Sequence, residues 1–215
     1  MQTKPQHAPK AGTKELGPRV LDARFVASAA KPEQLPDATC DEIAFAGRSN
    51  VGKSSLLNLL LQRQGLVRTS KTPGCTRGVN LFSVQFEGGR ALVFADLPGY
   101  GYAARSKTER EAWAPLIEGY LQRRTALKAL AVLVDVRRGV EEDDAGLIDL
   151  GVELGLVTFV VATKLDKLAP SKRKPALAAL ARSVREPVVG ASAVTGEGRT
   201  AILGRIFAAT DVASE

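Results

Sequence analysis

Hydrophobic residues in this chain form short continuous runs that alternate with longer stretches of helical spacing. The run at residues 130–134 is apolar throughout, and residues 157–162 are apolar except for Thr158, which is typical of strands buried on both faces of a sheet. Other runs predict five further strands, at residues 24–28, 42–46, 81–86, 91–95 and 187–190. The residues Glu87-Gly88-Gly89-Arg90 join two of these strands and predict a hairpin with a Gly-Gly turn.

Helices are predicted between these runs. Leucines at positions 56, 57, 59 and 60 have the spacing of one helix face. Together with similar patterns they predict helices at residues 53–63, 109–124, 141–154, 172–183 and 200–209. Pro115 predicts either a kink in the second of these helices or a later start for it.

Strands that alternate with helices predict an α/β fold of three layers. We expect a mostly parallel six-stranded sheet covered by helices, with one antiparallel edge strand from the hairpin and an extra N-terminal strand. Such sheets bind ligands at the carboxyl ends of their strands. The residues that directly follow each predicted strand are therefore candidates for the functional site.

Composition fits one soluble domain. The chain has 215 residues, of which 45% are hydrophobic and 25% charged. Residues 1–20 are polar and rich in Lys, Pro and Gly, which predicts a flexible tail before a single domain at 21–213. With neither a secretory segment nor an apolar stretch of roughly 20 residues, a cytoplasmic monomer without a membrane partner is the default expectation. Cys40 and Cys75 are expected to be free thiols.

A phosphate-binding motif follows the strand predicted at 42–46. The sequence Gly47-Arg48-Ser49-Asn50-Val51-Gly52-Lys53-Ser54 fits G-x-x-x-x-G-K-[ST] in full and precedes a leucine-rich helix, as this motif requires. Its glycines let backbone N–H groups surround phosphates, and the helix N-terminus adds positive potential. Lys53 can reach the β and γ phosphates, and the Ser54 hydroxyl can bind Mg²⁺. This loop predicts a nucleoside triphosphate site.

A second phosphate element follows the strand at 91–95. Asp96 in Asp96-Leu97-Pro98-Gly99 can hold the Mg²⁺ shell through water, and the Gly99 N–H can bond the γ-phosphate. A lone Asp-x-x-Gly is more often a plain turn. Its place at the end of a strand, after the phosphate loop, favours the functional interpretation.

Guanine selection is predicted at the ends of two more strands. The Asp166 carboxylate, in Thr163-Lys164-Leu165-Asp166, can accept two hydrogen bonds from guanine, whereas adenine has no donors there and would leave it unpaired. The Lys164 stem can lie along the base. Ser192-Ala193 could offer backbone N–H groups to the guanine carbonyl.

Together these motifs resemble the EngB (YihA/YsxC) family of TRAFAC-class bacterial ribosome-biogenesis GTPases, from about residue 24 to the C-terminus. The resemblance implies a Ras-like P-loop G domain with slow Mg²⁺-dependent GTP hydrolysis. It also implies that the protein acts as a switch in assembly of the large ribosomal subunit and is needed for normal cell division and septation. The stretches that carry it are Gly47–Ser55, Ser70–Arg77, Asp96-Leu97-Pro98-Gly99-Tyr100-Gly101-Tyr102-Ala103 and Thr163–Asp166.

Site residues are carried over from the family by position. Lys53, Asn50 and Thr76 are the implied catalytic residues, and Thr76 resembles the switch threonine that joins Ser54 on Mg²⁺. Asn50 lies where related GTPases hold K⁺, which suggests K⁺ as a further cofactor. The implied nucleotide contacts are Gly47, Arg48, Ser49, Asn50, Val51, Gly52, Lys53, Ser54, Ser55, Gly74, Cys75, Thr76, Arg77, Gly78, Asp96, Leu97, Pro98, Gly99, Thr163, Lys164, Leu165, Asp166, Ala191, Ser192 and Ala193.

Two departures from the usual GTPase pattern matter. Tyr100 stands where Ras-like proteins keep a catalytic glutamine, and it cannot orient water in the same way, so we expect slow intrinsic hydrolysis. Thr163 replaces the usual asparagine. Its shorter side chain cannot contact the base with an amide and brace the phosphate loop at the same time. We therefore expect affinity in the micromolar range.

Charge points to a polyanionic partner. The net charge is +7, and residues 167–185 contain six cations and no acid before Arg185. This run fits either a solvated helix face or a surface that contacts ribosomal RNA. No RNA-binding motif is recognisable in the sequence, so the charges alone do not decide between the two. A switch loop at residues 99–108 would present Tyr102, Arg105 and Lys107 to the partner.

Two alternatives remain open. The protein could hold GTP without significant turnover, or it could be a P-loop enzyme of another class, such as a small-molecule kinase. Against the second, the sequence has no recognisable acceptor-site base and no Arg-rich lid.

Overall fold

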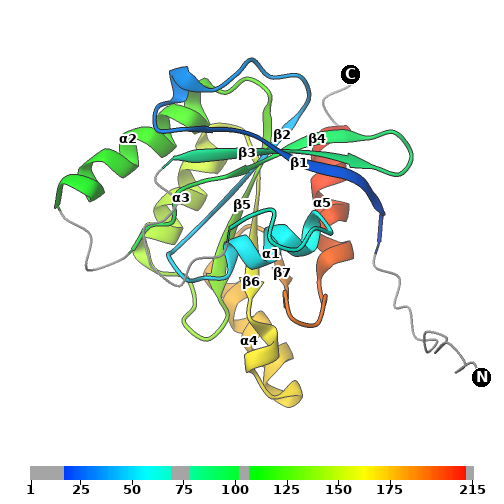
Figure 1. Ribbon diagram of the computed structural model, residues 1–215. Coiled ribbons are helices and arrows are strands. Elements are labelled where there is room, and N and C mark those ends of the chain that lie inside the picture. Colours follow the sequence, from blue (N-terminus) through cyan, green and yellow to red (C-terminus); the bar gives the residue numbers. More distant parts are fainter. Residues whose placement is uncertain (1–16, 69–77, 102–106, 212–215) are drawn as a thin grey trace, which may run out of the picture.

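The computed structural model describes residues 17–68, 78–101 and 107–211, with only the backbone at positions 32 and 107–114. Its strands form one sheet of order β1-β3-β4-β2-β5-β6-β7 (Figure 1). They are β1 Val20–Ala29, β2 Glu42–Gly47, β3 Val79–Phe86, β4 Ala91–Asp96, β5 Leu127–Asp135, β6 Val157–Thr163 and β7 Val188–Gly190.

Strand directions confirm the predicted sheet. The five strands from β4 to β7 in the sheet order are parallel, and β3 is antiparallel to β4. The extra strand β1 pairs antiparallel with β3 along its whole length, from Val20 opposite Phe86 to Ala29 opposite Val79. This pairing explains why β1 begins four residues before the start that its own hydrophobic pattern predicts.

The helices lie in two layers. They are α1 Lys53–Leu60, α2 Lys107–Arg123, α3 Glu142–Glu153, α4 Pro170–Ser183 and α5 Arg199–Asp211, with short 3₁₀ turns η1 Pro32–Gln34 and η2 Leu165–Lys167. α1 ends before the predicted residue 63 because Gln62 has a left-handed φ of 50°. α2 begins at Lys107 and continues through Pro115, so a start after this proline is wrong.

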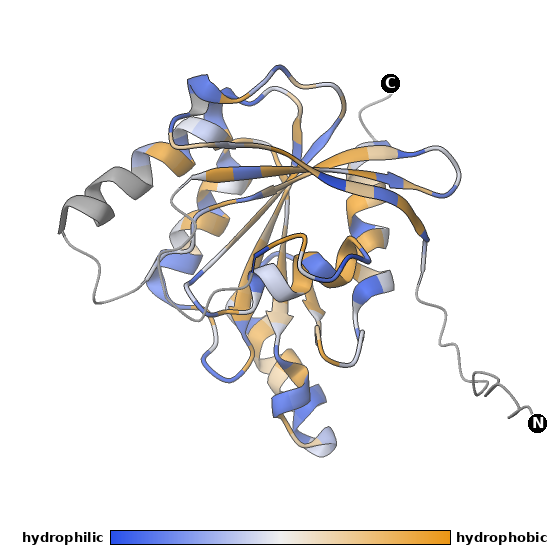
Figure 2. Ribbon diagram, viewed as in Figure 1, coloured by the Kyte–Doolittle hydropathy of each residue, from blue (hydrophilic) through white to orange (hydrophobic). Residues whose placement is uncertain are grey.

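Each face of the sheet has its own core, and Figure 2 shows hydrophobic stretches in orange alternating with hydrophilic ones in blue along the helices that cover it. On one face Phe45 and Phe94 pack with ring centroids 5.0 Å apart, under α1 and α5. On the other face the alternate residues of the same strands pack against α2, α3 and α4. The fold is therefore the expected three-layer α/β arrangement. Within the described parts of the chain, no helix is long and apolar enough to cross a membrane.

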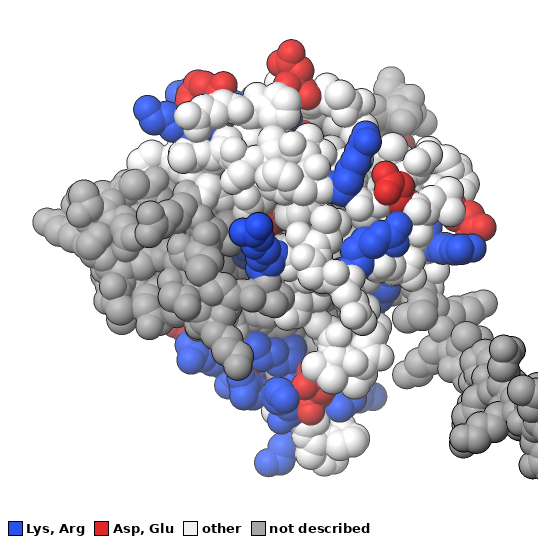
Figure 3. All heavy atoms as spheres, viewed as in Figure 1, with Lys and Arg blue, Asp and Glu red and all other residues white. Residues whose placement is uncertain are grey.

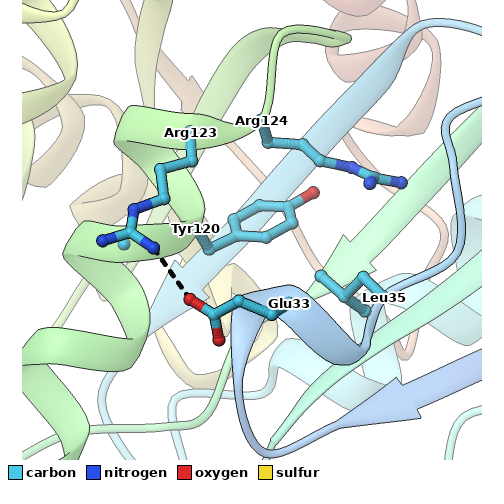
Figure 4. A pocket seen from close by; sticks show the side chains of 6 residues that line it. Glu33, Leu35, Tyr120, Arg123 and Arg124 are labelled. Carbon is cyan, nitrogen blue, oxygen red and sulfur yellow. Dashed lines mark hydrogen bonds and ion pairs between the residues drawn. The ribbon is translucent and has the colours of Figure 1, made fainter.

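A buried polar cluster joins β2 to the end of α2. Glu42 is 1% exposed and accepts hydrogen bonds from the Tyr120 hydroxyl at 2.8 Å and from both sides of the Arg124 guanidinium at 2.7 and 2.8 Å. Figure 4 shows the ends of the Tyr120 and Arg124 side chains near one another, with Glu33 of η1 paired to Arg123 beside them. The strand that leads to the phosphate loop is thus fixed at its start.

A buried arginine fixes the end of α1. Arg199 is 1% exposed, and its guanidinium donates to the carbonyls of Leu59 and Leu60 at 3.2 Å and to that of Pro18 at 2.9 Å. Both carbonyls lie in the last turn of α1, whose carbonyls lack the usual partners inside the helix; that of Leu59 also accepts the Gln62 N–H at 3.2 Å. Pro18 lies inside the predicted tail 1–20, and this hydrogen bond attaches it to α5. The predicted limits of the tail, 1–20, and of the domain, 21–213, stay a prediction.

Candidate nucleotide-binding site

The parallel strands are in register, so that their carboxyl ends lie at the same edge of the sheet. Phe45 of β2 is opposite Asp96 of β4, Gly47 is opposite Leu133 of β5, and Asp135 is opposite Thr163 of β6. This register brings the phosphate loop and the residues that follow β4, β5 and β6 to one edge of the sheet. It is the edge at which the sequence predicts the site.

The phosphate loop turns sharply between β2 and α1. Asn50 and Gly52 have positive φ angles of 64° and 105°, and α1 starts at the next residue, Lys53. Gly47 packs so closely on β5 that a Cβ there would lie 2.8 Å from the Leu133 carbonyl oxygen. The loop therefore needs glycine at the two positions the motif specifies, once for space and once for backbone conformation.

Lys53 joins the two predicted phosphate elements. Its ammonium group forms a buried ion pair with the Asp96 carboxylate, with the two side chains 7% and 2% exposed. The Leu97 N–H donates to the Phe45 carbonyl at 3.0 Å and holds the Asp96 turn against β2. Asp96 and the hydroxyl of Ser54, the residue after Lys53 in α1, offer hard oxygen donors. Such a small set fits Mg²⁺, which keeps several water ligands.

Thr163 braces the phosphate loop. Its hydroxyl is buried, with Oγ1 2.7 Å from the Val51 carbonyl oxygen and 3.1 Å from that of Val134. A hydroxyl has one hydrogen to donate, so the shorter contact with the loop is the main one. Thr163 thus performs the bracing half of the asparagine role and has no amide to offer a base.

Lys164 lies beside the loop in a left-handed conformation, with a φ of 62°. Its ammonium donates to the Asn50 carbonyl at 2.6 Å and pairs with the Asp135 carboxylate at 3.1 Å. Arg137 also holds Asp135, through two contacts of 2.6 and 2.9 Å, and this keeps the pKa of Asp135 well below its usual range. The carboxylate therefore anchors Lys164 at neutral pH.

The side chains of Asp166 and Ser192 contact each other at this edge of the sheet. The Ser192 hydroxyl donates to Asp166 Oδ1 at 2.8 Å, and this hydrogen bond lowers the pKa of Asp166. The backbone N–H groups of Ala191 and Ser192 donate to the carbonyls of Ala162 and Glu197, at 2.8 and 3.0 Å. Of the three predicted residues after β7, Ala193 remains the candidate N–H donor to a guanine carbonyl.

Several predicted residues lie outside the described part of the chain. They are Gly74, Cys75, Thr76, Arg77, Tyr102 and Arg105. Gly78 is described and lies against β1, where a Cβ would come 2.3 Å from the Ala29 carbonyl oxygen. Cys40 is a free, half-buried thiol.

Two acidic residues at this edge were missed by the sequence analysis. Asp135 ends the apolar β5 as Asp96 ends β4, and the same strand-end reasoning would have found it. Asp144 lies in the first turn of α3 and accepts a hydrogen bond from the buried Tyr100 hydroxyl at 2.6 Å. Acidic residues are common in the first turn of a helix, so the sequence position of Asp144 did not indicate a contact with Tyr100.

Comparison with known proteins agrees with this geometry. Residues 42–164 match the family described as 50S ribosome-binding GTPase. A probable GTP-binding protein EngB of Exiguobacterium sibiricum is 42% identical over 193 residues, which cover 88% of this chain and 98% of that protein. One of Syntrophotalea carbinolica is 41% identical over 92% of this chain and 95% of its own length. The crystal structure of a probable GTP-binding protein EngB, 26% identical, superposes with a TM-score of 0.63 over 79% of this chain and 98% of that one.

Proposed function

The chain belongs to the EngB family of ribosome-binding GTPases, and from this premise we propose that it is a cytoplasmic switch in assembly of the large ribosomal subunit. In this proposal the GTP form binds the assembling subunit and slow, Mg²⁺-dependent hydrolysis releases it. Normal cell division and septation then depend on the protein through the supply of ribosomes.

The orientation of Asp166 carries the proposal of guanine specificity. Ser192 holds one oxygen of the carboxylate, and Lys167 lies 3.4 Å from the other. The side chain is only 13% exposed and its lowered pKa keeps it ionised. A carboxylate fixed in this way can accept both guanine donors, whereas with adenine it would lose water without gaining a partner.

Direct binding measurements test this assignment. Calorimetric titration with GTP, GDP and ATP should show binding of the guanine nucleotides, and Asp166→Ala should abolish the preference over ATP. Asp149→Ala, which removes an exposed carboxylate from α3, is the matched control and should leave affinities unchanged. Binding of ATP as tight as that of GTP in the wild type would refute the proposal.

Hydrolysis supplies the next test, because turnover separates a switch from a protein that only holds GTP. We propose Lys53, Thr76 and Asn50 as the catalytic set, with K⁺ as a cofactor held near Asn50. The left-handed Asn50, whose carbonyl is already held by Lys164, supports this placement. Rates of phosphate release should be higher in KCl than in NaCl of equal ionic strength; equal rates would exclude the role of K⁺.

For the ribosomal contact we propose the basic surface of α4, where Figure 3 shows Lys and Arg side chains gathered at the bottom of the view. Lys167, Lys172 and Lys174 are exposed there. Arg173 is partly committed to the fold, because it pairs with Glu197 at 3.0 Å and donates to the Leu168 carbonyl at 3.2 Å. RNA phosphates would bind such a surface through charge.

A charge-reversal experiment examines this surface. Lys172→Glu with Lys174→Glu should weaken binding to large subunits and reduce its salt dependence. Arg19→Glu with Arg24→Glu, at exposed positions next to and within β1, changes the net charge by the same amount and serves as the control. The α4 double variant leaves the Arg173 contacts with the fold intact. Unchanged, salt-insensitive binding of the α4 double variant would place the ribosomal contact elsewhere.

A further inference from the structure

The phosphate loop and the turn after β4 are bound to each other by their backbones. The Ser49 N–H donates to the Tyr100 carbonyl at 2.8 Å, and the Tyr100 N–H donates to the Gly47 carbonyl at 3.4 Å. Gly99, between them, is so close that a Cβ there would lie 3.2 Å from the Ser49 hydroxyl oxygen. Any movement of Gly99 relative to the phosphate loop must therefore break these contacts.

The Tyr100 side chain secures this junction from the side of α3. It is 3% exposed, and its hydroxyl donates to Asp144 Oδ1 at 2.6 Å. The other oxygen of Asp144 accepts the Glu141 N–H at 3.0 Å and caps the helix. Both oxygens of this buried carboxylate are thus engaged, one with α3 itself and one with the residue that follows Gly99.

Arg48 crosses the same junction from the phosphate loop. Its guanidinium donates to the Gly101 carbonyl at 3.2 Å and pairs with Glu141 at 3.0 Å and Asp143 at 3.4 Å. Gly101 has a φ of +70°, and a Cβ there would lie 2.6 Å from the Arg48 guanidinium carbon. The guanidinium therefore occupies the space that only glycine leaves open.

We propose that Arg48, Tyr100 and Asp144 form a clasp that positions the Gly99 N–H for the γ-phosphate of GTP. These are positioning residues, since the Tyr100 hydroxyl is directed to α3. The proposal rests on the proposed assignment of this site to guanine nucleotides. It explains how a tyrosine serves where a water-orienting glutamine is the Ras-like choice: the side chain fixes the backbone on which the γ-phosphate bond depends.

The clasp makes a selective prediction, because GDP has no γ-phosphate. Loosening the clasp should weaken binding of GTP and leave binding of GDP unchanged. A cluster that only stabilised the fold would lower the melting temperature and leave the ratio of the two affinities as it is. The ratio therefore separates positioning from plain stability.

Tyr100→Phe removes one hydroxyl and is the primary test. Tyr120→Phe is its matched control, because that hydroxyl is equally buried and also donates to a carboxylate, Glu42 at 2.8 Å, away from the nucleotide edge. Affinities for GDP and a non-hydrolysable GTP analogue are measured by calorimetry on the full chain, with melting temperatures beside them.

For Tyr100→Phe we expect affinity for the analogue to fall by about tenfold, the scale of one charge-assisted hydrogen bond, with affinity for GDP within about twofold of the wild type. Tyr120→Phe should keep the wild-type ratio. Asp144→Asn removes the charge to which the Tyr100 hydroxyl donates and lies outside the implied nucleotide contacts. It should shift the ratio in the same direction, and it decides the question if Tyr100→Phe does not fold. A wild-type ratio in the clasp variants would overturn the clasp. Absence of guanine nucleotide binding by the wild type would instead overturn the proposed function.

Discussion

The hydroxyl of Thr163 offers a sharp test of how the phosphate loop is held. Thr163→Val keeps the shape of this buried side chain and removes only the donor to the Val51 carbonyl at 2.7 Å. A hydrogen bond of this kind contributes about 0.5–1.5 kcal/mol, and a carbonyl left without its partner adds a further penalty. Because about 1.4 kcal/mol corresponds to a tenfold change, we expect nucleotide affinity to fall by roughly two- to tenfold.

Thr163→Ser is the matched control, since it keeps the hydroxyl and loses one methyl group. The lost methyl lowers stability by about 1 kcal/mol and should leave affinity near the wild-type value. Calorimetric Kd values for GDP and urea unfolding curves for both variants give the two quantities separately. If Val and Ser at this position weakened GDP binding equally, the hydroxyl brace would not be what orders the loop.

Three further substitutions probe other contacts. Asp135→Asn should weaken GDP binding several-fold by releasing Lys164. Because the pKa of Asp135 lies well below the usual value of about 4, its stabilisation is full above about pH 5 and is lost as the pH falls further. The deficit in melting temperature should therefore stay constant from about pH 7 to about pH 5 and shrink at lower pH. Glu42→Gln should reduce the free energy of unfolding in urea by about 3 kcal/mol by leaving Arg124 without its charge partner, and Arg124→Met in the same chain should recover part of the loss. Gly78→Ala should lower the melting temperature and reduce the free energy of unfolding by about 1–3 kcal/mol, because β1 must move away from the new Cβ. An unchanged melting temperature would show that the strand moves at no cost.

Much of the fold could be predicted because its signals are local. The apolar runs of β5 and β6 and the leucines of α1 identify their elements directly. Element ends were less predictable, because they depend on tertiary contacts. α1 stops where Gln62 turns left-handed, and β1 is as long as its pairing with β3 allows.

The site divides in the same way. Lys53, Asp96 and Asp166 stand in a motif or follow a strand end, so their positions in the sequence were enough to place them at one edge of the sheet; their roles in nucleotide binding stay a prediction. The Tyr100–Asp144 contact joins residues 44 positions apart through the packing of α3, and neither residue type is unusual where it stands. Such pairings exist only in the assembled fold, and a single sequence does not record them.

The arginine that closes α1 has a consequence for the order in which the protein matures. The segment that matches the GTPase family ends at residue 164, yet the last carbonyls of the phosphate-loop helix are satisfied by Arg199. Synthesis proceeds from the N-terminus, so the complete phosphate motif emerges well before the residue that secures its helix. We therefore expect the nascent chain to acquire full nucleotide affinity only when α5 docks, and not when the phosphate motif itself has emerged.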